Sequence, residues 1–293
     1  MNHIVKRTLS GLIVGGGVVA LFLWCPLCAV GGIVLALSSL AQLEFYQMSK
    51  RYEPVTWFGI LMGAAWIGGT AYLGMRLVTE ALYVYTPFVI APVFFLLCAW
   101  VLFRPRYAHP LGSIASTLLG FLYVPFLFSF FLMIIDLGAA SDAPRTGLYT
   151  LLALIAMAKF SDTGGFAFGM AFGKHKMCPL ISPKKSWEGL VGSMLFAAAT
   201  ACVFLAVSRH YGWGTTVGAW NRMTYPVAAA VGALVALLAT VGDLIESRFK
   251  RECGVKDSAT FMPAGMGGFL DMFDSILFIP SLFYFPLLWT CMP

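Results

Sequence analysis

The acidic residues best placed to do chemistry lie near the C-terminus of the chain. Asp271 and Asp274 are three residues apart in an apolar stretch, so a helix would carry both carboxylates on one face. Carboxylates this close repel each other unless a cation lies between them, and oxygen ligands suit Mg²⁺ when substrate phosphates complete its coordination. The alternative is a pair of acids that only favours the positive end of a helix dipole.

Two further acidic groups lie in or beside apolar segments. Asp162 follows Lys159 late in one apolar run, and Asp243 and Glu246 lie at the end of another. An ionisable residue at membrane depth is costly and usually faces a polar cavity or a partner. We therefore expect these groups and the C-terminal acids to converge on one site at one side of a membrane.

Two groups of cations accompany these acids. Topology signals alone could explain them, because positive loops stay on the cytoplasmic side of a membrane. Lysines and arginines around metal-binding carboxylates are, however, also what phosphoryl or nucleotidyl transfer requires. The two groups are Lys174, Lys176, Lys184 and Lys185, and then Lys250, Arg251 and Lys256.

A glycine-rich segment, residues 263–268, precedes Asp271. Glycines let a backbone approach a ligand closely, and their amides could face phosphate at the start of a helix. Glycine also serves helix packing in membranes, so this segment is weak support by itself.

Together these segments resemble the signature of the phosphatidate cytidylyltransferases, or CDP-diacylglycerol synthases. The similar blocks are residues 242–251 with 256–258 and the continuation over 263–275. Upstream, residues 161–165, 172–176 and 182–189 are similar as well. The resemblance covers roughly residues 155–280, and the first half shares only its hydrophobic character.

The chain departs from the family pattern at two positions. Met266 stands where the family has a histidine, with Ala264 as an extra residue, and Met272 stands where it has an arginine. A histidine base or an arginine phosphate clamp therefore cannot be assigned there. Since both acids keep their spacing, we interpret the chain as a divergent but active member.

The resemblance implies transfer of a cytidylyl group from CTP to phosphatidate, with Mg²⁺ as cofactor and Asp271, Asp274 and Asp243 as metal ligands. It also suggests a homodimer. The catalytic residues it implies are Asp243, Lys250, Arg251, Lys256, Asp257, Asp271 and Asp274. The substrate-binding residues it implies are Asp162, Lys174, Ser182, Lys184, Lys185, Glu246, Ser247, Gly267 and Gly268.

Composition identifies the elements that must position these residues. The chain is 60% hydrophobic and 11% charged, with a mean hydropathy of +0.85. Soluble domains are about a quarter charged, so lipid must be the solvent for most of this chain. Runs of about 20 apolar residues indicate membrane-spanning helices, and the alternating segments of a β-barrel are not seen.

The sequence therefore predicts an all-α polytopic membrane protein with about nine spans. Residues 1–146 would form the first five spans, and residues 147–293 a catalytic membrane region with the signature at 243–275. The predicted spans are residues 8–24, 27–46, 55–76, 84–103, 110–136, 147–168, 189–208, 224–242 and 268–291.

With a cytoplasmic N-terminus, this count places most of the 19 Lys and Arg in cytoplasmic loops. We expect a multi-pass protein of the inner (plasma) membrane whose active site faces the cytoplasm. Its partners would be CTP, phosphatidate and the bilayer. The net charge of +6 is explained by topology and anionic substrates, so nucleic acid is not expected.

Two other functions stay open, as does the role of one cysteine pair. A transporter would also carry intramembrane charges, but it predicts them near the midplane and in repeated halves. Another lipid or nucleotide transferase would use aspartates too, although the dense aspartate pattern of CDP-alcohol phosphotransferases is absent. Cys25 and Cys28 form one isolated pair, which is weak support for a metal and compatible with a disulfide.

Overall fold

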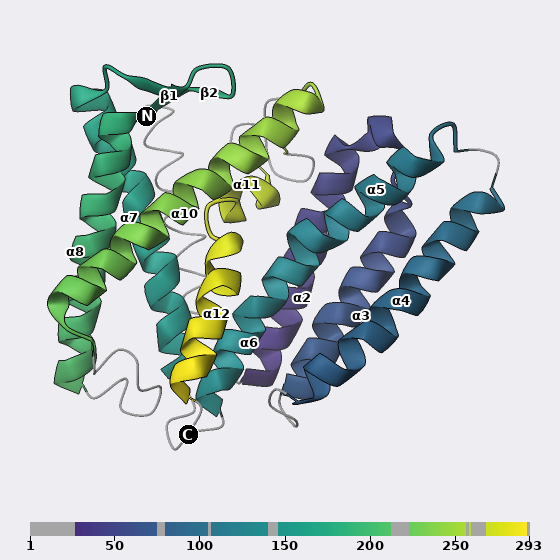
Figure 1. Ribbon diagram of the computed structural model, residues 1–293, viewed down its shortest axis with the longest axis horizontal. Coiled ribbons are helices and arrows are strands. Elements are labelled where there is room, and N and C mark those ends of the chain that lie inside the picture. The colour runs from purple at the N-terminus through teal and green to yellow at the C-terminus, as the bar shows by residue number, and fades with distance from the viewer. Residues whose placement is uncertain are drawn as a thin grey trace. The chain divides into compact units, whose positions relative to one another are not determined.

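The computed structural model describes residues 27–74, 80–104, 107–139, 146–211, 223–255, 258 and 268–291, which are almost entirely helical (Figure 1). Helices satisfy every backbone hydrogen bond internally, as lipid requires. Within these ranges, six helices are long and apolar enough to cross a membrane: Ala29–Met48, Pro110–Leu137, Thr146–Phe172, Trp187–Tyr211, Tyr225–Glu252 and Phe269–Leu287.

The chain is thus an all-α polytopic protein, and the count of nine spans stays a prediction. The predicted span 8–24 lies outside the described residues. The predicted spans 55–76 and 84–103 correspond to α3 (Thr56–Gly74) and α4 (Glu80–Leu102).

The chain divides into two compact units. The first comprises Met1–Leu132 with Asp257–Met272, and the second comprises Met133–Lys256 with Phe273–Pro293. The functional division after residue 146 stays a prediction.

Hydrogen bonds between helices hold the first unit together. The hydroxyl of Tyr46, on α2 (Leu27–Met48), donates to the carbonyl of Thr117 on α5 (Pro110–Phe121) at 2.8 Å. The amide of Gln42 donates to the carbonyl of Gly59 on α3 at 2.9 Å. In lipid, such polar contacts and close backbone approach stabilise helix pairs.

A π-helical turn, η2 (Leu122–Phe126), joins α5 to α6 (Leu127–Ala139). It contains Pro125, which cannot donate a backbone hydrogen bond. The wider turn absorbs this interruption, so the chain crosses as one long helical run. This run corresponds to the predicted span 110–136.

In the second unit, α7 (Thr146–Phe172) packs along α8 (Trp187–Tyr211), and α10 (Tyr225–Glu252) crosses them (Figure 1). Glycines permit the α7–α8 contact. A Cβ atom on Gly164 would lie 2.5 Å from the carbonyl oxygen of Gly192, and one on Gly192 would lie 2.7 Å from that of Gly164. Larger residues would force these helices apart.

A β-hairpin connects α7 to α8, a feature that the sequence did not predict. Its antiparallel strands are β1 (Lys176–Cys178) and β2 (Ser182–Ser186). The backbone N–H of Trp187 donates to the carbonyl of His175 at 3.0 Å, which fixes the base of the hairpin at the start of α8. The loop lysines are therefore held on a short, ordered element.

The predicted span 268–291 corresponds to the apolar segment Phe269–Leu287, but a turn interrupts its helix. α11 (Phe269–Phe273) is followed by a turn, and α12 (Phe278–Cys291) begins after it. Pro280 lies in the first turn of α12, where its ring disfavours a helical carbonyl four residues earlier, at Ile276. Asp271 therefore lies in α11, whereas Asp274 lies in the turn.

Candidate active site

Three carboxylates of the second unit form a compact acidic cluster: Asp243, Glu246 and Asp274. One oxygen from each lies within 4.8 Å of the others. Asp243 and Glu246 are three residues apart on α10 and so share one helix face. Glu246 is fully buried, and Asp274 is nearly so.

Gly242 allows the turn that carries Asp274 to approach α10. A Cβ atom at position 242 would lie 2.6 Å from the carbonyl oxygen of Asp274. Any side chain there would push the turn away from α10. The glycine before Asp243 thus has a packing role that brings acids 31 residues apart in sequence to one place.

Two lysines balance the charge of the acidic cluster. Lys185 Nζ on β2 lies 2.7 Å from Asp243 Oδ2, and it donates to the carbonyl of Thr240 at 2.9 Å. Lys250 Nζ lies 2.7 Å from Glu246 Oε2, one turn along α10. Buried charges must be paired to be tolerated, so these contacts make the acidic cluster compatible with its location.

A serine connects the acidic cluster to α7. Ser275 Oγ donates to Asp162 Oδ2 at 3.3 Å, and Lys159 Nζ donates to Ser275 Oγ at 3.3 Å. The backbone N–H of Ser275 donates to the carboxylate of Asp274. Asp162, predicted as substrate-binding, is therefore hydrogen-bonded to the residue that follows Asp274.

Asp271 has a different environment, which belongs to the first unit. Its Oδ2 accepts hydrogen bonds from the backbone N–H of Gly268 at 2.7 Å and of Ser258 at 3.4 Å. The N–H of the adjacent Leu270 donates to Glu44 Oε2 at 2.9 Å. The Asp271 carboxylate thus accepts backbone hydrogen bonds at the start of α11. Its role as a metal ligand stays a prediction.

The remaining predicted residues of α10 lie around the same helix end. Ser247 Oγ donates to Asp243 Oδ1 at 3.4 Å. Arg251 Nε donates to the carbonyl of Ile181 at 3.5 Å, next to the predicted Ser182. The last turns of α10 therefore contact the hairpin, so cations of both elements are available to one anionic ligand.

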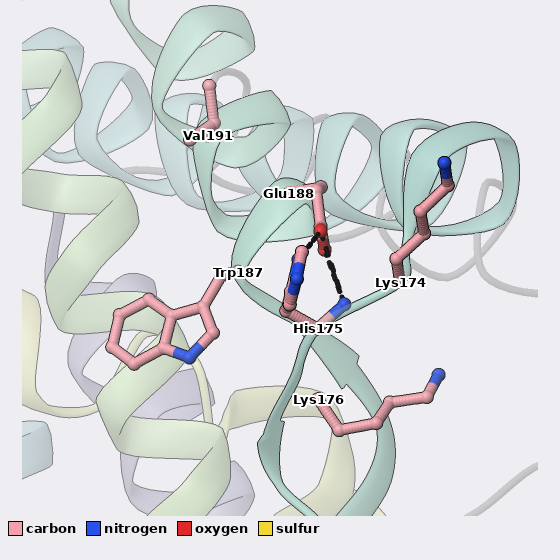
Figure 2. A pocket seen from close by; sticks show the side chains of 6 residues that line it. All are labelled: Lys174, His175, Lys176, Trp187, Glu188 and Val191. Carbon is pink, nitrogen blue, oxygen red and sulfur yellow. Dashed lines mark hydrogen bonds and ion pairs between the residues drawn. The ribbon is translucent and has the colours of Figure 1, made fainter.

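An open pocket lies at the base of the hairpin (Figure 2). His175 Nδ1 lies 2.6 Å from Glu188 Oε1, and the backbone N–H of His175 also reaches that carboxylate. Lys174 and Lys176 extend away from Trp187 (Figure 2). The pocket lining is Lys174, His175, Lys176, Trp187, Glu188 and Val191. Lys174 and the nearby Lys184 are exposed and accessible to an anion.

Several predicted positions lie outside the described residues. Lys256, Asp257 and Gly267 are among them, as are the departure at Met266 and the Cys25 end of the cysteine pair. Their roles stay predictions. Met272, the other departure, lies in α11 and is partly buried.

Sequence reasoning expected Lys159 and Glu246 near the convergent acids but assigned Glu246 to substrate, and it gave Ser275 no role. Glu246 shares the α10 face of Asp243, a three-residue spacing that could have placed it in the acidic cluster. Ser275 carried no signal of its own, because a serine after an aspartate is common in turns. In the structure, Ser275 lies in the turn between α11 and α12, and its hydroxyl donates to Asp162 from there.

The donor set of the acidic cluster fits a hard cation such as Mg²⁺. Mg²⁺ prefers oxygen ligands, and it commonly binds through one or two carboxylates plus substrate phosphates. Three carboxylates each offer one oxygen here. The lysines on Asp243 and Glu246 occupy single oxygens, Oδ2 and Oε2, and each carboxylate has a second oxygen that can accept.

Comparison with known proteins identifies related sequences. The model of the cytidylyltransferase family matches residues 5–289. A phosphatidate cytidylyltransferase of Haemophilus influenzae is 39% identical over 143 residues, 48% of this chain and 47% of that protein. One of Mycobacterium bovis is 36% identical over 173 residues, 59% of this chain and 50% of that protein.

A more extended match is to the phosphatidate cytidylyltransferase of Chlamydia muridarum, which is 29% identical over 261 residues. That alignment covers 86% of this chain and 82% of the relative. The alignments to the Haemophilus and Mycobacterium proteins, in contrast, span about half the length of those relatives.

Proposed function

Because the chain belongs to the cytidylyltransferase family, we propose that it transfers a cytidylyl group from CTP to phosphatidate, giving CDP-diacylglycerol and pyrophosphate. The observation that carries this proposal is the acidic cluster of Asp243, Glu246 and Asp274 with Lys185 and Lys250 bound to it. Carboxylates for a metal beside cations for phosphate are the groups that nucleotidyl transfer uses.

The reaction is an in-line displacement at phosphorus. A phosphate oxygen of phosphatidate attacks the α-phosphorus of CTP and forms a new P–O bond. The bond from the α-phosphorus to the oxygen bridging the β-phosphorus breaks, and pyrophosphate leaves with that electron pair. A phosphate monoester has a second pKa near 6, so the nucleophile is ionised without a protein base.

The protein must therefore align the reactants and neutralise their charge. Lys185 and Lys250 would contact phosphates of CTP, with Arg251 and Lys184 beside them. Asp243, Glu246 and Asp274 would hold Mg²⁺, and Asp271 is the further ligand that the family signature implies. When bound, Mg²⁺ would neutralise phosphate charge and act as a Lewis acid.

The apolar helices support a location in a membrane, and we propose the inner (plasma) membrane with the site on its cytoplasmic face. The acyl chains of phosphatidate would stay in the bilayer, while CTP would arrive from water. A homodimer is proposed from the family resemblance alone.

One assay tests the proposed function. Purified protein in detergent is expected to convert radiolabelled CTP into a lipid-extractable product when phosphatidate and Mg²⁺ are both present. Removing the metal with EDTA should stop the reaction, and adding excess Mg²⁺ should restore it, because carboxylates without a cation cannot hold a triphosphate. Thin-layer chromatography against authentic CDP-diacylglycerol identifies the product, and its absence would refute the proposal.

Replacing Met266 with histidine tests the first departure from the family. We expect kcat to change by less than about tenfold, because an ionised monoester needs little help from a general base, whose contribution is typically a hundredfold or more. The rate is measured with both substrates saturating from pH 6 to 9. A gain of a hundredfold would mean that the missing histidine limits this enzyme.

A further inference from the structure

Lys159 is a cation in the middle of a membrane-spanning helix. It lies 13 residues before the end of α7, which is about 20 Å along the helix axis. Its side chain is 46% exposed. A charge at such a position is costly and indicates a functional contact.

Lys159 contacts the hydroxyl of Ser275, the residue that follows Asp274 of the acidic cluster. Lys159 Nζ lies 3.3 Å from that hydroxyl, and Asp274, the residue before Ser275, contributes an oxygen to the acidic cluster. Asp162 Oδ2 lies 3.9 Å from Lys159 Nζ, beyond hydrogen-bond distance. The ammonium therefore lies beside the acidic cluster without being enclosed by it.

The lysines near the acidic cluster belong to different elements. Lys185 belongs to the hairpin, outside the membrane-spanning helices, and Lys250 to the last turns of α10. Lys159 approaches instead from the middle of α7. We therefore expect a water-soluble triphosphate to meet the first two lysines, and a phosphate attached to acyl chains to meet the third.

The surface of α7 around Lys159 suits acyl chains. Phe160 is 54% exposed and Phe166 is 62% exposed, so large apolar side chains are exposed on the same helix as Lys159. Apolar exposure beside one half-exposed cation matches a ligand that is a phosphate at one end and hydrocarbon at the other.

We propose that Lys159, oriented by Ser275, binds the phosphate monoester of the lipid substrate, as a subsite distinct from the cations that hold CTP. This inference rests on the proposed function and deepens it. An ammonium donates up to three hydrogen bonds, and a doubly charged monoester attracts it more strongly than a phosphodiester does. Asp162 balances the Lys159 charge when lipid is absent.

The test is Lys159→Gln, studied in nanodiscs. Losing a charge-assisted hydrogen bond is expected to raise KM for phosphatidate roughly ten- to a hundredfold. KM for CTP should stay within about twofold, because the lost contact is made to phosphatidate and not to CTP. Binding of radiolabelled phosphatidate without CTP or Mg²⁺ should weaken by the same factor, and Lys159→Arg should restore most of it.

Lys50→Gln is the matched control, since it removes one exposed positive charge from the other unit and should leave both KM values unchanged. Unchanged phosphatidate binding in Lys159→Gln, or an equal rise in both KM values, would overturn the inference. If Lys159→Gln does not fold, Ser275→Ala keeps the cation and should raise only the phosphatidate KM, by about threefold; no rise would count against the subsite. A wild-type protein that binds phosphatidate but makes no CDP-lipid would refute the function alone.

Discussion

Asp274→Asn is expected to lower kcat by roughly a thousandfold while the protein stays folded. Asparagine has nearly the same shape, so the turn after α11 can keep its backbone. It removes the negative charge from the oxygens that lie within 4.8 Å of Asp243 and Glu246. A weaker anionic ligand set holds Mg²⁺ less tightly, and the charge of the triphosphate is then poorly neutralised.

The measurements are turnover of radiolabelled CTP and Mg²⁺ binding by titration calorimetry. The Mg²⁺ affinity should fall together with kcat, and higher Mg²⁺ concentrations should recover part of the rate. Asp136→Asn is the matched control, because Asp136 is a partly buried aspartate on α6 outside the acidic cluster. Near-normal turnover of Asp274→Asn would remove this residue from the metal site.

Much of the acidic cluster was predictable because its elements follow simple spacing rules. Asp243 and Glu246 had to share a face of a long apolar helix, and Lys250 had to lie one turn from Glu246. The cost of charge at membrane depth indicated that these side chains would face partners. These inferences need only the helical period and the low polarity of lipid.

The position of Asp274 relative to Asp271 was not predictable in this way. Their spacing on an assumed helix predicted one shared face, yet α11 ends at Phe273. Pro280, to which we attribute the interruption of the helix, lies six residues beyond Asp274. Its presence in the sequence did not reveal the interruption, because proline is tolerated in the first turn of a helix. Spacing therefore could not distinguish a continuous helix from a new helix starting after a turn.

The hairpin was missed for a related reason. Residues 176–186 contain two prolines and three lysines, a composition that is typical of a polar loop. The strands form because the ends of α7 and α8 are brought together by packing such as that of Gly164 against Gly192. Tertiary context of this kind decides short strands more than local propensity does.

Lys250→Met is expected to destabilise the second unit by about 3 kcal/mol or more, because it leaves Glu246 buried without its cation. Glu246 is fully buried and the Lys250 side chain is 11% exposed, with 2.7 Å between their charged atoms. The same change should also weaken CTP binding, since Lys250 is proposed to contact the triphosphate. Thermal unfolding in detergent, followed by intrinsic tryptophan fluorescence, measures the stability.

The double variant Lys250→Met/Glu246→Gln separates the two effects. Removing both charges should recover most of the lost stability, because a neutral side chain at position 246 no longer needs a buried cation. Activity should stay low in the double variant, since both the phosphate contact and a metal ligand are missing. Added Mg²⁺ should raise the unfolding temperature of Lys250→Met more than that of the double variant, because only the single variant keeps all three carboxylates for the metal to neutralise. If Lys250→Met unfolds at the wild-type temperature with or without Mg²⁺, the ion pair does not stabilise the acidic cluster.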